Sequence, residues 1–205
     1  MRIRITFSKQ GALRYTGHLD LHKLWERATR RAGLPLAYSQ GFHPQPKMNM
    51  AAALPLGFSS RCEMMDMKLE NEIALDGLRE RLNETLPSGI QVLSVEQVDE
   101  RAPALQTQVT SAGYEVTLTE TVDGSELKRK VDSVMESESI LRERRRRMYD
   151  LRPLIESLEI SSEGKIRMQL SAREGATGRP EEVLDILGIA FEGTRIERTH
   201  LNFQS

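Results

Sequence analysis

Strand-like and helix-like periods follow one another in an order that occurs twice along the 205-residue chain, and this repeat is what most constrains the fold. Residues 2–8 alternate polar and apolar side chains with period two, as a half-buried strand does. Residues 19–32 change to helical spacing and place Leu21, Trp25 and Ala28 on one face. Two strand-like pieces, a further strand, a second helix and a closing strand are predicted over residues 36–39, 47–54, 61–69, 73–86 and 90–98.

The second half of the chain shows the same order. Strands are predicted over residues 114–119, 140–151, 165–171 and 195–203, although arginines obscure the pattern of the second of these. One helix is predicted over residues 126–135, and another begins at Pro180 and ends at Gly188. Two consecutive βαββαβ units predict an α+β protein made of two tandem ferredoxin-like domains. We place these domains at residues 1–98 and 113–205, with residues 99–112 as a linker.

Composition excludes several classes of protein. Hydrophobic residues make up 39%, charged residues 29% and aromatic residues 5%, which is typical of a globular protein with an aliphatic core. No apolar run approaches the roughly twenty residues of a membrane helix, and residues 1–5 lack the apolar block of a signal peptide. The single cysteine, Cys62, can form neither an internal disulfide nor a thiolate metal cage. We therefore expect a cytoplasmic protein without a membrane partner, a bound metal or a cofactor.

The net charge of −1 conceals a strong segregation of charge. Residues 1–50 contain nine Lys/Arg and two Asp/Glu, whereas residues 51–140 contain eight and seventeen. Such an asymmetry suggests that the N-terminal part binds a polyanion, and the open alternative is a solvated surface neutralised by the acidic middle segment. If the polyanion is RNA, the candidate phosphate ligands of this part are Lys9, Arg14, Lys23, Arg27, Arg30, Arg31 and Lys47.

A second basic feature is the run of five arginines in residues 142–147. Guanidinium groups bind phosphates in a bidentate manner, so Arg144, Arg145, Arg146 and Arg147 are further RNA-binding candidates. In a strand these side chains would divide between the two faces. The alternative is an edge strand that charge protects from aggregation.

Residues 38–47 (YSQGFHPQPK) form a loop that glycine and proline make stiff. Tyr38 and Phe42 are the two aromatic side chains that could stack on bases, and Gln40, His43 and Lys47 are candidates for polar contacts with RNA. The alternative is a tight connection between strands. We expect Phe42 to pack inward.

Two histidines lie at the N-terminal end of the first predicted helix. His18 and His22 are four residues apart and share a helix face, with Asp20 between them. No third metal ligand stands out, and the bare spacing is a weak signal, so we predict capping by Thr16, His18 or Asp20 in place of a metal. A metal-independent ribonuclease needs a histidine or lysine near the attacked 2′-hydroxyl, which makes His18 and His43 the candidate catalytic residues.

Several motifs together resemble a known family. They are the segment FxK at residues 7–9, HLD at 18–20, RA at 27–28, RAGLP at 31–35, YSQGFHPxPK at 38–47, LPLG at 54–57, Glu63 with Asp66, and DLRP at 150–153. This pattern is similar to the radical-SAM-linked domain of unknown function, which bacteria have as a free-standing protein or fused behind a radical SAM protein with a cobalamin-binding-like region. The resemblance implies a radical SAM partner and an RNA-related setting. It also implies that position 43 can be Asn, which cannot exchange a proton near neutral pH.

The chain itself lacks the cysteines of a radical SAM cluster, because it has one cysteine in all. The first hypothesis is therefore a non-catalytic accessory protein that binds RNA, tRNA or rRNA, and acts with a radical SAM partner. The second is a protein-interaction module that docks that enzyme without touching RNA. The third is a metal-independent ribonuclease or another RNA-modifying enzyme.

Overall fold

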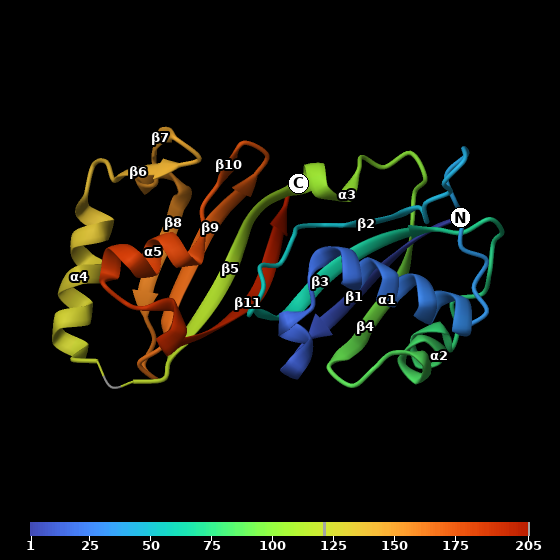
Figure 1. The fold of residues 1–205 in the computed structure, drawn as a ribbon, viewed down its shortest axis with the longest axis horizontal. Coiled ribbons are helices and arrows are strands. Elements are labelled where there is room, and N and C mark those ends of the chain that lie inside the picture. Colours follow the sequence, from blue (N-terminus) through green and yellow to red (C-terminus); the bar gives the residue numbers. More distant parts are fainter. Residues whose placement is uncertain (121, 205) are drawn as a thin grey trace. The chain divides into compact units, whose positions relative to one another are not determined.

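The structure of the protein is a computed structural model, which describes residues 1–120 and 122–204. The chain divides into two compact units, Met1–Gln108 and Val109–Ser205. Each unit combines helices with an antiparallel sheet, which confirms the predicted α+β class (Figure 1). Among the described residues, no helix has both the length and the hydropathy that crossing a bilayer requires.

The first unit has the order strand, helix, strand, strand, helix, strand. Its sheet runs β4-β1-β3-β2, with every neighbouring pair antiparallel. Its elements are β1 (Arg2–Lys9), the 3-10 helix η1 (Gly11–Tyr15), α1 (His18–Arg31), β2 (Met48–Met50), β3 (Ser59–Lys68), α2 (Leu78–Thr85), β4 (Ile90–Val98) and the short α3 (Leu105–Gln108).

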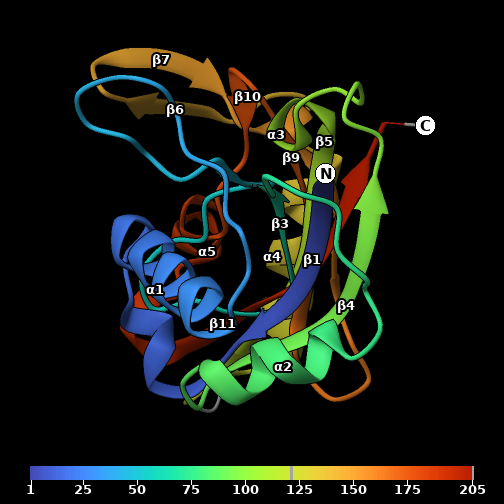
Figure 2. The same cartoon turned by 90° about the vertical axis from the view of Figure 1, so that its right-hand side faces the viewer.

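The core of this unit lies between one face of the sheet and the helices α1 and α2 (Figure 2). Ile3, Ile5 and Phe7 of β1 are completely buried, as the period-two pattern predicts. Trp25 of α1 is also completely buried and meets the Phe7 ring edge-on, with 4.8 Å between the centroids. This contact fixes which face of α1 points to solvent.

Three predicted elements of this unit differ from those observed. The helix predicted over 73–86 begins at Leu78, because Gly77 before it is left-handed with φ of 71°. The strand predicted over 36–39 is only two isolated bridges, at Leu36 and Tyr38, and the strand predicted over 47–54 shortens to β2. Prolines 35, 44 and 46 lack the amide hydrogens that a continuous ladder needs.

The second unit contains the same sheet arrangement in the order β11-β5-β9-β8, with β10 also beside β9. Its elements are β5 (Val109–Leu118), α4 (Gly124–Glu136), β6 (Leu141–Arg144), β7 (Arg147–Asp150), η2 (Arg152–Leu154), β8 (Ile155–Ile160), β9 (Ile166–Arg173), β10 (Ala176–Thr177), α5 (Pro180–Leu187), η3 (Phe191–Gly193) and β11 (Thr194–Phe203). The assignment of either unit to the ferredoxin-like fold stays a prediction.

Two segments of this half were predicted incorrectly. Residues 140–151 are a hairpin of β6 and β7 and not one strand, because the chain reverses at Arg145 and Arg146. Strand β8 was missed, since a register shift between Ile155 and Ser157 breaks the alternation that reveals a strand. The predicted linker, residues 99–112, contains α3 and the first residues of β5.

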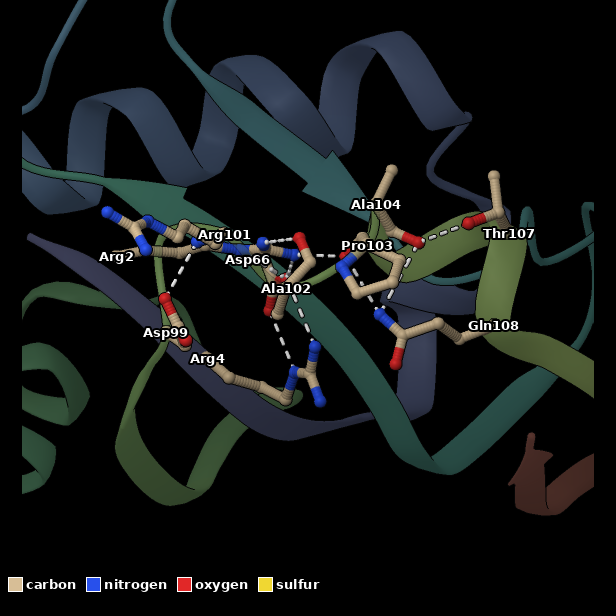
Figure 3. A network of polar contacts seen from close by, with 10 residues as sticks. All are labelled: Arg2, Arg4, Asp66, Asp99, Arg101, Ala102, Pro103, Ala104, Thr107 and Gln108. Carbon is tan, nitrogen blue, oxygen red and sulfur yellow. Dashed lines mark hydrogen bonds and ion pairs between the residues drawn. The ribbon is translucent and has the colours of Figure 1, made fainter. Parts of the chain in front are cut away.

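A carboxylate in the first unit joins β1, β3 and the chain that follows β4 (Figure 3). Asp66 of β3 is buried and accepts hydrogen bonds from Arg2 Nε at 3.0 Å and from Arg4 Nε at 2.8 Å. The Arg2 guanidinium also donates to the carbonyl oxygens of Ala102 and Pro103, at 2.6 and 2.9 Å. Asp66 thus pairs with two arginines at once, and one of them, Arg2, holds residues 102–103 against the sheet.

We expect Asp66→Asn to lower the free energy of unfolding by about 3 kcal/mol, because the change leaves two partly buried guanidinium groups without their carboxylate. Chemical denaturation followed by circular dichroism measures the loss. Glu80→Gln is the control, since it removes an exposed carboxylate that pairs with Arg79, and it should leave the unfolding midpoint unchanged. A midpoint for Asp66→Asn equal to that of the wild type would contradict this role.

Candidate nucleic-acid interface

Helix α1 presents a row of cations on the face opposite its buried side. Thr29 sits on the buried side, where its hydroxyl donates to the Trp25 carbonyl at 2.7 Å. At about 100° per residue, the cations fall within roughly 100° of one another around the helix axis. We call this exposed set the α1 ridge, and it consists of Lys23, Arg27, Arg30 and Arg31.

Few carboxylates compete for the α1 ridge. Asp20 lies 3.9 Å from the ammonium group of Lys23, and both side chains are mostly exposed, so this pair is weak. Glu26 accepts from Arg30 at 3.2 Å and from the Tyr38 hydroxyl at 3.0 Å. Neither Arg27 nor Arg31 has a hydrogen-bond or ion-pair partner among residues 1–120 and 122–204. The ridge therefore offers open positive charge to a ligand.

Other cations of the N-terminal part are not available in this way. Arg2 and Arg4 are held by Asp66, as described above. Lys9 was predicted to bind phosphate, but only 1% of its surface is exposed, and its Nζ donates to the Thr16 carbonyl at 3.0 Å. Lys9 follows Phe7 on the buried side of β1. The prediction that Lys9 binds phosphate is therefore wrong. Arg14 is half-buried and stacks on the Tyr15 ring at 4.7 Å.

The segment between Tyr38 and Lys47 is closed by short backbone contacts. The Ser39 amide donates to the Gln45 carbonyl at 2.8 Å, and the Gln45 amide donates to the Ser39 hydroxyl at 2.9 Å. We call residues 39–45 the closed loop. Tyr38 is half-buried and hydrogen-bonded to Glu26, so its predicted role in stacking on bases is not supported.

Side chains of the closed loop project outward. Gln40 and His43 are exposed, and so is Lys47 just beyond it. Phe42 is fully exposed, at 101%, which overturns the expectation that it packs inward. The closing hydrogen bonds and Gly41, with φ of 130°, hold this part of the chain away from the core.

A pocket of about 410 Å³ is lined in part by the four consecutive residues Pro46, Lys47, Met48 and Asn49. Arg2 and Asp66 also line it, and their hydrogen bonds to each other occupy most of their polar groups. Lys47 and Lys68 are the exposed cations at this pocket, and Lys68 pairs with Glu100 at 2.8 Å. We therefore retain Lys47 as the candidate phosphate ligand.

A pocket between α1 and the end of the closed loop contains the paired histidines. It has a volume of about 380 Å³, and we call it the histidine pocket, lined among others by His18, Leu19, His22, Lys23, Gln45 and Met48. The rings of His18 and His22 lie edge to face with 4.6 Å between their centroids. Burial, and then the neighbouring His18, lower the pKa of His22.

The capping that we predicted here is not found, because the N-cap of α1 is Gly17 and makes no side-chain hydrogen bond. No group of three or more His, Cys, Asp or Glu side chains in the described parts of the chain could hold a metal ion. A general base needs an orienting hydrogen bond, and among those same residues neither the His18 nor the His43 ring makes one. The geometry thus adds no support for catalysis by these histidines.

In the second unit the arginine run forms the end of the β6–β7 hairpin. Arg142 pairs with Asp185, and Arg144 pairs with Glu182 and lies over the Tyr149 ring at 4.7 Å. These contacts fix the stem of the hairpin to α5 and consume the charge of two arginines. The exposed residues Arg145, Arg146 and Arg147 have no ion-pair partner among the described residues, and we call them the arginine tip.

Residues 2–180 match a family described as an uncharacterized protein conserved in bacteria (DUF2344). The chain belongs to this family. The DUF2344 match spans the α1 ridge, the closed loop, the histidine pocket and the arginine tip. No curated protein shows significant similarity to the chain.

Sequence reasoning missed two features of this DUF2344 protein. One is the outward position of Phe42, which the closely spaced Gly41, Pro44 and Pro46 around it could have indicated. The other is the strained turn of the hairpin, where Arg145 and Arg146 have φ of 51° and 64°. Two positive φ values in a two-residue loop define a type I′ turn, which normally requires Asn-Gly, so no sequence signal marked it.

We expect the double change Arg145→Asn with Arg146→Gly to stabilise the hairpin by about 1–3 kcal/mol, because both new residues tolerate left-handed backbone. Amide hydrogen exchange of β6 and β7 measures the gain as slower exchange. The control, Arg147→Asn, changes the exposed arginine next to the two left-handed positions and should leave exchange at the wild-type rate. Unchanged exchange in the double variant would show that the turn stores no strain.

The lowered pKa of His22 predicts a pH dependence of stability. The folded state binds a proton at His22 less readily than the unfolded chain does, whose ordinary histidine value is 6.5. The stability from neutral His22 is therefore complete above that value and is lost as the pH falls through the lower, folded pKa. Between about pH 7.5 and about pH 5.5, the free energy of unfolding should fall less for His22→Gln than for the wild type. His43→Gln, at an exposed site, is the control, and equal slopes for all three proteins would contradict the prediction.

Proposed function

We propose that this protein is a non-catalytic accessory protein that binds RNA, either tRNA or rRNA, and acts with a radical SAM partner. The observation that carries the proposal is the α1 ridge, in which exposed cations line one helix face with little competition from carboxylates. Such a row matches the spaced negative charges of a phosphate backbone. The radical SAM partner rests on the family resemblance described above.

The surroundings of the α1 ridge favour RNA over a simple polyanion. The closed loop presents the polar side chains of Gln40 and His43 near the end of a rigid segment, and Lys47 follows as a further cation. The histidine pocket lies at the flank of the same helix and contains Lys23 at its rim. The cations suit the phosphates of an RNA ligand, and the hydrogen-bonding groups and the pocket suit its polar bases.

The arginine tip is a second candidate phosphate contact, located in the other unit. A guanidinium group forms bidentate hydrogen bonds with a phosphate, and three such groups here are free of carboxylates among the described residues. The strained turn supports this role, since left-handed arginines persist only where something other than local stability favours them.

Salt dependence tests the proposal directly. If about six phosphates of single-stranded RNA are engaged, log K should fall against log salt with a slope near −4. The triple variant Lys23→Ala, Arg27→Ala, Arg31→Ala should reduce the magnitude of the slope by about 2 and weaken binding to all sequences alike. Filter binding to total tRNA and rRNA at several salt concentrations measures both.

The matched control for this experiment is Arg79→Ala with Arg81→Ala, which removes two exposed cations from α2 of the same unit. This variant should bind RNA as the wild type does. A wild-type slope near zero, or an equal loss in the control, would refute the proposal.

A second candidate function is a module that docks the partner enzyme without RNA. Leu19 and Leu56 are 75% and 61% exposed, and a docked partner would bury apolar side chains of this kind. In that case Leu19→Ala should release a co-purifying radical SAM enzyme, while neither the wild type nor the triple variant binds RNA.

A further inference from the structure

The aromatic ring of Phe42 is the most exposed large hydrophobic side chain of the described residues, at 101% against 75% for Leu19. Burial of such a ring is one of the larger favourable terms available to a protein, and here the fold does not use it. The ring is therefore available in full to a ligand.

The backbone that carries the ring is also restrained. The closed loop is fastened by the Ser39–Gln45 contacts at 2.8 and 2.9 Å, and beyond it Tyr38 bridges to Pro46. Just outside, the Lys47 amide donates to the Ala37 carbonyl at 2.8 Å. Two prolines and these contacts restrict the backbone, so little backbone conformational entropy is lost when the ring meets a ligand.

Along the sequence, the charged residues nearest to Phe42 are all cations. No acidic residue occurs between Glu26 and Glu63 in the sequence, a stretch that contains the whole closed loop. Glu26 itself is engaged by Arg30 and the Tyr38 hydroxyl. An exposed flat ring in an acid-free, cationic segment suits a ligand that has both a flat π face and negative charge.

We propose that Phe42 stacks on an unpaired base of single-stranded RNA, with Lys47 at a neighbouring phosphate. This inference rests on the proposed function and gives its substrate class. An unpaired base exposes its face to an aromatic side chain, whereas the bases inside a duplex are covered by their neighbours. The ligand is therefore a loop, a bulge or a strand end and not a continuous helix.

Replacing Phe42 with tryptophan creates a reporter of stacking. The single natural tryptophan, Trp25, is completely buried and gives a constant background that a ligand in solution cannot reach. We expect a single-stranded RNA of about ten nucleotides to quench the new fluorescence, and the duplex of the same sequence to leave it unchanged.

Affinity provides the second measurement. Phe42→Ala should weaken binding to the single strand by about 5- to 150-fold, the range measured when a stacked aromatic side chain is removed, and Phe42→Trp should retain the wild-type affinity. The slope of log K against log salt should stay the same in Phe42→Ala, because no phosphate contact is lost. The control Leu141→Ala removes another exposed apolar side chain, on β6, and should leave the affinity unchanged.

The outcomes separate the two proposals. If the wild type binds RNA with the expected salt slope but Phe42→Ala binds equally well, the stacking inference fails and the proposed function stands. If the wild type shows no salt-dependent binding of RNA, the proposed function fails. A blue shift of Phe42→Trp with vesicles of phosphatidylserine and phosphatidylcholine, together with no response to RNA, would overturn the stacking inference in favour of a membrane surface. The stacking inference is also overturned if neither RNA nor vesicles change the fluorescence of Phe42→Trp.

Discussion

The burial of one face of α1 against β1 is the contact on which the candidate interface depends. Trp25 and Phe7 are completely buried and meet edge to face, which fixes the rotation of the helix about its axis. Since helical side chains repeat every 3.6 residues, the same rotation directs Arg27 and Arg31 to solvent. An aromatic contact in the core thereby decides where positive charge lies on the surface.

Charge in the sequence and charge on the surface are different quantities in this protein. Arg2 and Arg4 belong to the basic N-terminal part, yet both are paired with Asp66 from the acidic middle segment within the same unit. Lys9 is buried, and Arg144 is paired with Glu182. Of the predicted phosphate ligands, the exposed ones that remain are the α1 ridge, Lys47 and the arginine tip, a smaller set of cations than composition suggests.

Much of the fold could be predicted from periodicity, because burial on one side imposes a pattern on the side chains. Strand β1, helix α1 and strand β4 lie close to their predicted positions for this reason. Strand β8 escaped prediction since a bulge interrupts its alternation, and the hairpin escaped because arginines occupy a turn that normally requires Asn-Gly. Local irregularities of this kind leave no periodic signal.

The sequence by itself determined the α+β class, the element order of the first unit and the cationic character of α1, since each follows from local spacing and residue type. Only the tertiary structure decided that Lys9 is buried, that Tyr38 faces Glu26 and that Phe42 points outward. These outcomes depend on contacts such as Ser39 with Gln45 and on the pairing of strands distant in sequence. A residue type states what a side chain can bind, whereas the packing around it decides whether a ligand can reach it.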